Sequence, residues 1–154
     1  MAESIRIRAI PSARSTAVRP GTPLAFGPLV STVFVVDDDP EQAELLAAAL
    51  SVDGRRVRAF SDPLRALDAL VVEGTDLLIA DLSMPWIDGA QIVETVRRLR
   101  PGVPILLVSG YGRGAEVTAR YGLQFFRKPI DLGGLRATVE ALLPSSLQSP
   151  AGPA

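Results

Sequence analysis

The chain has 154 residues, of which 47% are hydrophobic and 21% are charged, and this length and composition predict one soluble globular domain. Its formal net charge of −1 gives no general attraction to nucleic acid or anionic lipid, and no apolar run approaches the roughly 18 residues that span a bilayer. It contains neither cysteine nor histidine, which excludes disulfides, thiol nucleophiles, imidazole bases and metal sites built on either residue, and leaves oxygen-ligated cations such as Mg²⁺, Ca²⁺ or Mn²⁺.

The two ends of the chain differ in composition from its middle. The stretch "RIRAIPSARSTAVRPGTPLAFGP" holds four arginines and four prolines without a sustained hydrophobic period, so residues 1–31 are predicted to be a disordered extension. An organellar transit peptide or a basic arm that touches nucleic acid is the alternative for this segment. Residues 144–154, "PSSLQSPAGPA", are predicted to be a flexible tail. The folded domain is therefore expected over 32–143.

An apolar run, Thr32–Val36, opens the folded region and predicts a strand. A helix over 39–52 follows, because Asp39 is a typical N-cap, Pro40 suits the first helical position and Gln42 completes a capping-box pattern. Its buried face is expected to consist of Leu45, Leu46, Ala49 and Leu50.

The next elements repeat this alternation of strand and helix. The sequence predicts a strand over Arg56–Phe60, a helix over Pro63–Val72 and a strand over 76–80, with Asp62 and Pro63 repeating the cap and proline at the helix start. The buried stripe of the following helix is expected to consist of Ile92, Val93, Val96 and Leu99. The run "VPILLVS" is apolar throughout its strand-like part, which is typical of a central strand covered on both faces.

The last third of the folded region predicts a weak helix over 115–121, a strand over 124–128 and a final helix that begins at Asp131. The apolar residues of that final helix are Leu135, Val139, Leu142 and Leu143. Five strands alternating with five helices predict right-handed βαβ units and one doubly wound parallel sheet with helices on both faces. In such α/β sheets ligands bind beyond the carboxyl ends of the strands.

Polar side chains stand at four of these strand ends: Asp37 with Asp38, then Asp81, Ser109 and Lys128. The acids alone would repel one another, but a divalent cation between them turns repulsion into coordination, and the lysine adds a compact positive charge. Such a set suits a phosphoryl group, because phosphoryl transfer needs mainly positioning and charge neutralisation and a carboxylate can accept the phosphoryl group.

Four segments in this order, "VVDDDP", "LIADLSMPWIDG", "PILLVSG" and "FFRKPID", resemble the receiver domain of bacterial two-component response regulators. The resemblance covers residues 32–143. It implies a flavodoxin-like three-layer (βα)5 sandwich with strand order 2-1-3-4-5. It also implies a phosphoacceptor domain in two-component (phosphorelay) signalling, similar to the stand-alone chemotaxis regulators, that is not an enzyme beyond assisting its own phosphorylation and dephosphorylation.

The resemblance also implies a role for each site residue. Asp81 would accept phosphate from a partner's phosphohistidine, Lys128 would pair with the acids and then with the phosphoryl group, and Ser109 would donate its hydroxyl to a phosphoryl oxygen. Asp38 and Asp81 would bind Mg²⁺ through their side chains.

Three further residues complete the implied site. Ser83 would bind the Mg²⁺ through its backbone carbonyl, and Asp37 would hold metal-bound water. Phe125 would act with Ser109 as a switch: when the serine moves toward the phosphoryl group, the ring turns inward. The surface of the fourth strand, the fourth helix and the fifth strand would then change for a partner protein.

The partners implied are a sensor histidine kinase or a histidine phosphotransfer protein, since a chain without histidine cannot be its own phosphodonor, and an unknown output protein. No membrane or nucleic acid is expected as a partner. The absence of cysteine fits a reducing compartment, and we expect a cytoplasmic protein.

Two other interpretations of the function have less support in the sequence. "VVDDDP" also fits the start of haloacid-dehalogenase-like phosphatases, with Asp37 as nucleophile and Asp39 as acid. That assignment leaves Asp81 without a role and uses Asp39, which is better placed as a helix cap. The glycine-rich "SGYGRGAEV" and the weak helix after it also allow a receiver-like scaffold that never carries phosphate.

Overall fold

The computed structural model describes residues 30–52, 54–110, 112 and 114–143. The extension predicted over 1–31 lies outside these residues except for its last two positions, and the tail predicted over 144–154 lies wholly outside them. The elements are β1 (Thr32–Val36), α1 (Pro40–Leu50), β2 (Arg56–Phe60), α2 (Pro63–Val72), β3 (Leu77–Asp81), α3 (Gly89–Leu99), β4 (Ile105–Ser109), α4 (Gly114–Tyr121), β5 (Gln124–Arg127) and α5 (Leu132–Leu142).

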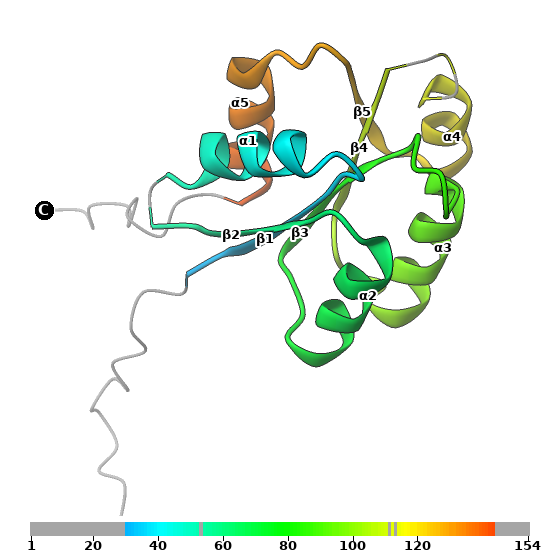
Figure 1. Cartoon of the computed structure of the whole chain (residues 1–154), viewed down its shortest axis with the longest axis horizontal. Coiled ribbons are helices and arrows are strands. Elements are labelled where there is room, and N and C mark those ends of the chain that lie inside the picture. Colours follow the sequence, from blue (N-terminus) through cyan, green and yellow to red (C-terminus); the bar gives the residue numbers. More distant parts are fainter. Residues whose placement is uncertain (1–29, 53, 111, 113, 144–154) are drawn as a thin grey trace, which may run out of the picture.

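The five strands form one parallel sheet in the order β2-β1-β3-β4-β5, which confirms the predicted topology. Helices α1 and α5 cover one face of the sheet, and α2, α3 and α4 cover the other (Figure 1). This is the three-layer flavodoxin-like sandwich. The strand order leaves β3 and β4 in the interior of the sheet, and every residue of both strands is buried.

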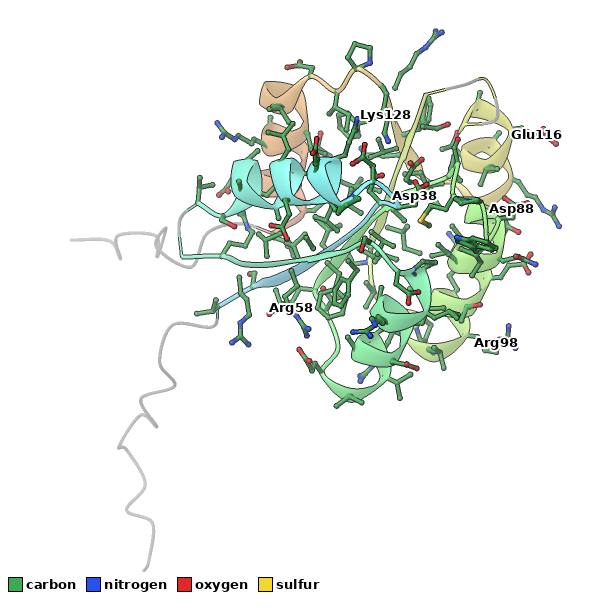
Figure 2. The ribbon with its side chains drawn as sticks, viewed as in Figure 1. Asp38, Arg58, Asp88, Arg98, Glu116 and Lys128 are labelled. Carbon is green, nitrogen blue, oxygen red and sulfur yellow. The ribbon has the colours of Figure 1, made fainter. Side chains whose placement is uncertain are left out.

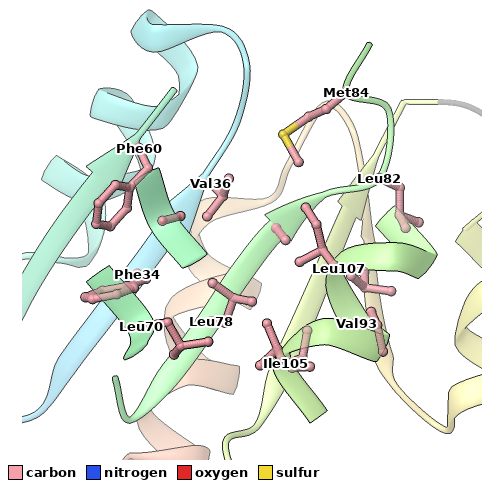
Figure 3. Close-up of a cluster of buried hydrophobic side chains, with 14 residues drawn as sticks. Phe34, Val36, Phe60, Leu70, Leu78, Leu82, Met84, Val93, Ile105 and Leu107 are labelled. Carbon is pink, nitrogen blue, oxygen red and sulfur yellow. The ribbon is translucent and has the colours of Figure 1, made fainter. Parts of the chain in front are cut away.

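The core consists of two clusters, one on each face of the sheet, because successive side chains of a strand point to opposite faces. In β1, Phe34 and Val36 join the cluster under α2 and α3, whereas Val33 and Val35 join the cluster under α1 and α5. Figure 3 shows the first of these clusters, in which strand residues such as Leu78 and Leu107 meet the helices.

Three predicted core positions are wrong. Leu45, Leu99 and Leu142 have exposed fractions of 60%, 42% and 38%. In α1 the buried stripe follows the helical spacing through Ala43, Leu46, Ala47 and Leu50, with Ala49 at its margin, so Leu45 points away from it. Leu99 and Leu142 are the last residues of their helices and lie beyond the last buried positions, Val96 and Val139.

Four of the five helices begin at an aspartate, as predicted for three of them. Asp39, Asp62 and Asp131 cap α1, α2 and α5, and Asp88 caps α3 within a capping box. Each carboxylate accepts a hydrogen bond from a backbone N–H that has no partner inside the helix. The helix starts are therefore fixed locally, close to the strand ends that precede them.

Candidate functional site

The residues predicted from strand ends meet at one edge of the sheet. Asp81 and Ser109 are the last residues of β3 and β4, Asp37 follows β1, and Lys128 follows β5. Because β1, β3, β4 and β5 are consecutive in the sheet, these side chains form a row. Figure 2 shows Asp38 and Lys128 at this same end of the molecule. The tertiary structure thus brings together groups that are up to 91 residues apart.

Lys128 bridges two of the acids. Its Nζ donates to Asp37 Oδ2 at 2.9 Å and to Asp81 Oδ2 at 3.0 Å. The two carboxylates are only 2% and 5% exposed, whereas the lysine side chain is 22% exposed. Hydrogen bonds between charged groups in such a partly desolvated place are strong. One ammonium group therefore holds the two buried carboxylates beside each other.

Backbone amides hold the other oxygen of each acid. Asp37 Oδ1 accepts the N–H of Asp39 at 3.0 Å, and Asp81 Oδ1 accepts the N–H of Ser83 at 2.9 Å. Only half of the capping box predicted between Asp39 and Gln42 is formed: Asp39 Oδ1 accepts the Gln42 N–H at 3.4 Å, but the Asp39 N–H donates to Asp37 and not to the Gln42 side chain. Asp39 still caps α1 through its carboxylate. Both acids are therefore oriented by hydrogen bonds at both oxygens.

The site shifts the pKa of two groups. Burial raises the pKa of Asp37, although Lys128 and the Asp39 N–H act in the opposite direction. Burial alone would lower the pKa of Lys128, but its hydrogen bonds to Asp37 and Asp81 outweigh that effect and raise it. The lysine is therefore held in its charged form between the two carboxylates.

Three acids are close enough to share a cation. Asp37, Asp38 and Asp81 each offer a carboxylate oxygen, and these oxygens lie within 4.8 Å of one another. Asp38 is exposed, so the group opens to solvent on that side. A set made only of carboxylate oxygens suits a hard divalent cation such as Mg²⁺. These residues therefore fit the predicted metal, and the place of the Ser83 carbonyl in its coordination stays a prediction.

Ser109 is fully buried, and its Oγ lies 3.3 Å from Ser83 Oγ. The N–H of Lys128 donates to the Ser109 carbonyl at 2.9 Å, which ties the ends of β4 and β5 together. Phe125 is half-buried and packs against the cluster under α2 and α3. The Lys128–Pro129 peptide bond is cis.

Two contacts near the site were not predicted from the sequence. One is the approach of the Ser83 and Ser109 hydroxyls. The other is the packing of the Phe125 ring against Gly114, the first residue of α4. The sequence signal for the second contact is the glycine-rich run before the helix, which by itself indicates only a weak helix.

Comparisons with known proteins agree with this geometry. A family model for the response regulator receiver domain matches residues 33–140. The transcriptional regulatory protein GlrR of Escherichia coli is 29% identical over 117 residues, which are 74% of this chain and 26% of that protein. The transcriptional regulatory protein TcrA of Mycobacterium tuberculosis is 32% identical over 115 residues, 71% of this chain and 45% of that protein. The chain thus spans less than half the length of these curated relatives.

Solved structures show the same fold. The crystal structure of a response regulator receiver protein from Pseudomonas putida has a TM-score of 0.67 and 29% sequence identity, and the match covers 73% of this chain and 97% of that one. Among the residues that the structure describes, no helix is long and apolar enough to cross a membrane.

Proposed function

Because the chain belongs to the response regulator receiver domain family of two-component signalling, we propose that Asp81 is the residue that accepts the phosphoryl group. The observation that carries this proposal is the bridge of Lys128 between Asp81 and Asp37 at the carboxyl ends of the strands. Asp81 ends a strand in the interior of the sheet, and both neighbouring strands contribute to its surroundings. Its carboxylate is thus fixed in position beside a positive charge.

In the proposed reaction a carboxylate oxygen of Asp81 attacks the phosphorus of a partner's phosphohistidine. The new P–O bond forms as the P–N bond breaks, and the electron pair of that bond stays on the imidazole nitrogen, which takes up a proton. Lys128 then pairs with the phosphoryl oxygens, and the Ser109 hydroxyl donates to one of them. These groups act by position and charge, which is what phosphoryl transfer needs from a protein.

Mg²⁺ is the proposed cofactor. Asp37, Asp38 and Asp81 would hold it together with the Ser83 carbonyl, Asp37 acting through metal-bound water. When bound, the cation supplies positive charge that offsets the repulsion between the acids and the incoming phosphoryl group. The grouping of the three carboxylates supports this assignment.

The alternative of a haloacid-dehalogenase-like phosphatase gains no support. Its acid would be Asp39, but that carboxylate accepts the Glu41 N–H at 3.0 Å and caps α1. Its nucleophile would be Asp37, which has the same pair of contacts as Asp81, Lys128 on one oxygen and a backbone N–H on the other, so these contacts give Asp37 no advantage. Asp81 would have no function in such an enzyme.

Response regulators take their phosphoryl group from histidine kinases, and we propose a sensor kinase or a histidine phosphotransfer protein as the donor here. The phosphorylated form would act on an output protein through the surface of β4, α4 and β5. Receiver domains are generally not enzymes, and this chain would catalyse only its own phosphorylation and dephosphorylation. GlrR and TcrA are named as transcriptional regulatory proteins, and the absence of nucleic-acid partners for this chain stays a prediction, as does its cytoplasmic location.

The first prediction tests the phosphoacceptor. After incubation with Mg²⁺ and acetyl phosphate, the intact mass of the wild-type chain should increase by one phosphoryl group. Asp81→Ala should take up none, because the proposal assigns the phosphoryl group to Asp81 and gives Asp37, the other acid bound to Lys128, to the metal. Quantification of the adduct by mass spectrometry gives the measurement.

Asp39→Ala is the matched control. It removes an acid from the same end of the sheet, weakens only the cap of α1 and should keep the adduct. Loss of the adduct in Asp39→Ala together with its retention in Asp81→Ala would overturn the assignment. The absence of an adduct in every variant and in the wild type would favour a scaffold that carries no phosphate.

A further inference from the structure

The Phe125 ring lies where a side chain at position 114 would be. A Cβ built on Gly114 would lie 2.0 Å from Cε2, 2.2 Å from Cζ and 2.6 Å from Cδ2 of that ring. These separations are far inside van der Waals contact. Gly114 is buried and begins α4, and Phe125 lies in β5. The ring thus rests directly on the backbone at the start of α4.

Ser109 and the ring share one face of the sheet. Phe125 pairs with Leu107 of β4, and Leu107 belongs with Phe125 to the cluster under α2 and α3. Ser109 stands two residues beyond Leu107 in the same strand, so its side chain points to that same face. A movement of the Ser109 side chain therefore changes the space on the face that holds the ring.

The contact ties the ring to α4. This helix has 8 residues, the smallest number among the described helices, and glycine favours a helix less than alanine does. If the Phe125 ring moved away from Gly114, the first turn of α4 would lose this packing contact. A ring that stays would keep that turn against β5.

We propose that Gly114 is a positioning residue for the switch. Because position 114 has no side chain, the Phe125 ring packs against the backbone at the start of α4 before phosphorylation. The position of the ring is thereby coupled to α4. This inference rests on the proposed function, because it assumes that Ser109 responds to a phosphoryl group on Asp81. The atoms that would clash belong to the ring and not to the backbone, so a methyl group at position 114 displaces the ring.

The test uses the full chain labelled with fluorinated phenylalanine, in which the Phe125 resonance is identified by its loss in Phe125→Leu. In Gly114→Ala, the ¹⁹F resonance of Phe125 in the unphosphorylated protein should shift toward its position in phosphorylated wild type. Because the variant destabilises the resting arrangement, its phosphorylation by acetyl phosphate should be about threefold faster or more. Gly112→Ala is the control, since a Cβ there meets nothing within 4 Å, and it should change neither quantity.

A double variant separates the contact between the ring and position 114 from other effects of the Gly114→Ala substitution. In a Phe125→Ala background the ring is gone, so adding Gly114→Ala should change the phosphorylation rate by less than about 1.5-fold. If Gly114→Ala alone does not fold, this double variant should fold, and its failure to fold would overturn the proposal. An unshifted Phe125 resonance in Gly114→Ala, or an equal rate effect without the ring, would also overturn it.

The same experiment distinguishes this inference from the proposed function. A wild-type chain that takes up no phosphate would overturn the phosphoacceptor assignment and the switch together. Phosphorylation of wild type without displacement of the ring in Gly114→Ala would overturn only the role of Gly114.

Discussion

At the scale of single residues, three consecutive acids have three different environments. Asp37 is buried and bound to Lys128, Asp38 is exposed with its carboxylate near those of Asp37 and Asp81, and Asp39 caps α1. The Asp39 N–H that binds Asp37 links the cap to the site. The start of α1 therefore helps to orient a carboxylate of the proposed metal site.

The pKa of Asp37 leads to a prediction on stability. Because burial raises this pKa above its unfolded value, the folded state binds the proton more tightly, and stability falls as the pH rises from the unfolded pKa through the folded one. Asp37→Asn removes that cost and leaves Lys128 paired with Asp81. In the absence of metal at pH 7, the variant should be more stable than wild type by about 1 kcal/mol in urea unfolding.

The difference should shrink as the pH falls below 3.8, the ordinary pKa of the carboxyl, because the wild-type group is then mainly protonated in both states. Mg²⁺ affinity should meanwhile fall tenfold or more, because a group that orients metal-bound water is lost. A variant that is less stable than wild type at pH 7 without metal would contradict the stated effect of burial.

At the scale of elements, glycine allows two close approaches that local helix preference does not explain. A Cβ on Gly89, the first residue of α3, would lie 2.2 Å from Leu82 Cδ2 and 2.8 Å from Leu82 Cα. Unlike the clash at Gly114, this one involves backbone. The start of α3 therefore packs directly on the chain that leaves β3.

Gly89→Ala should accordingly lower the free energy of unfolding by about 1 to 3 kcal/mol, the usual cost of overpacking, although alanine is the better helix former by about 1 kcal/mol. Denaturant midpoints measure the change. Gly102→Ala, where a Cβ meets nothing within 4 Å, is the matched control and should leave stability nearly unchanged. A Gly89→Ala protein as stable as wild type would show that the backbone of Leu82 can move away.

At the scale of the whole molecule, the acidic site exists only in the folded chain, because Asp37 and Asp38 follow β1 whereas Asp81 ends β3. A cation bound to this site stabilises the fold by mass action. Mg²⁺ at one hundred times its dissociation constant should raise the free energy of unfolding by about 2.7 kcal/mol. Thermal or urea unfolding with and without Mg²⁺ gives the measurement.

Asp38→Asn provides the control for that experiment. Asp38 is exposed and no ion pair to it is seen within the described ranges, so its removal should leave the metal-free stability within about 0.5 kcal/mol. It should abolish most of the stabilisation by Mg²⁺. Equal stabilisation of wild type and variant would place the cation elsewhere.

Much of this protein was predictable from its sequence. The apolar runs of β1 and β4, the aspartate–proline starts of α1 and α2, and the alternation of strands and helices all follow from neighbours along the chain. That alternation also predicts a parallel sheet, and so the edge at which Asp81 and Lys128 meet. These features depend on local preference and on a small set of allowed topologies.

Other features required the tertiary structure. The Asp39 N–H binds Asp37 and not Gln42, Leu45 lies outside the buried stripe, and the Phe125 ring occupies the place of a side chain at Gly114. Each depends on distances and angles between atoms of different elements or turns. A contact and a clash differ by only an ångström or two in such a distance. The sequence by itself determined which groups come to the site, whereas the packing of helices on the sheet decided which of them touch.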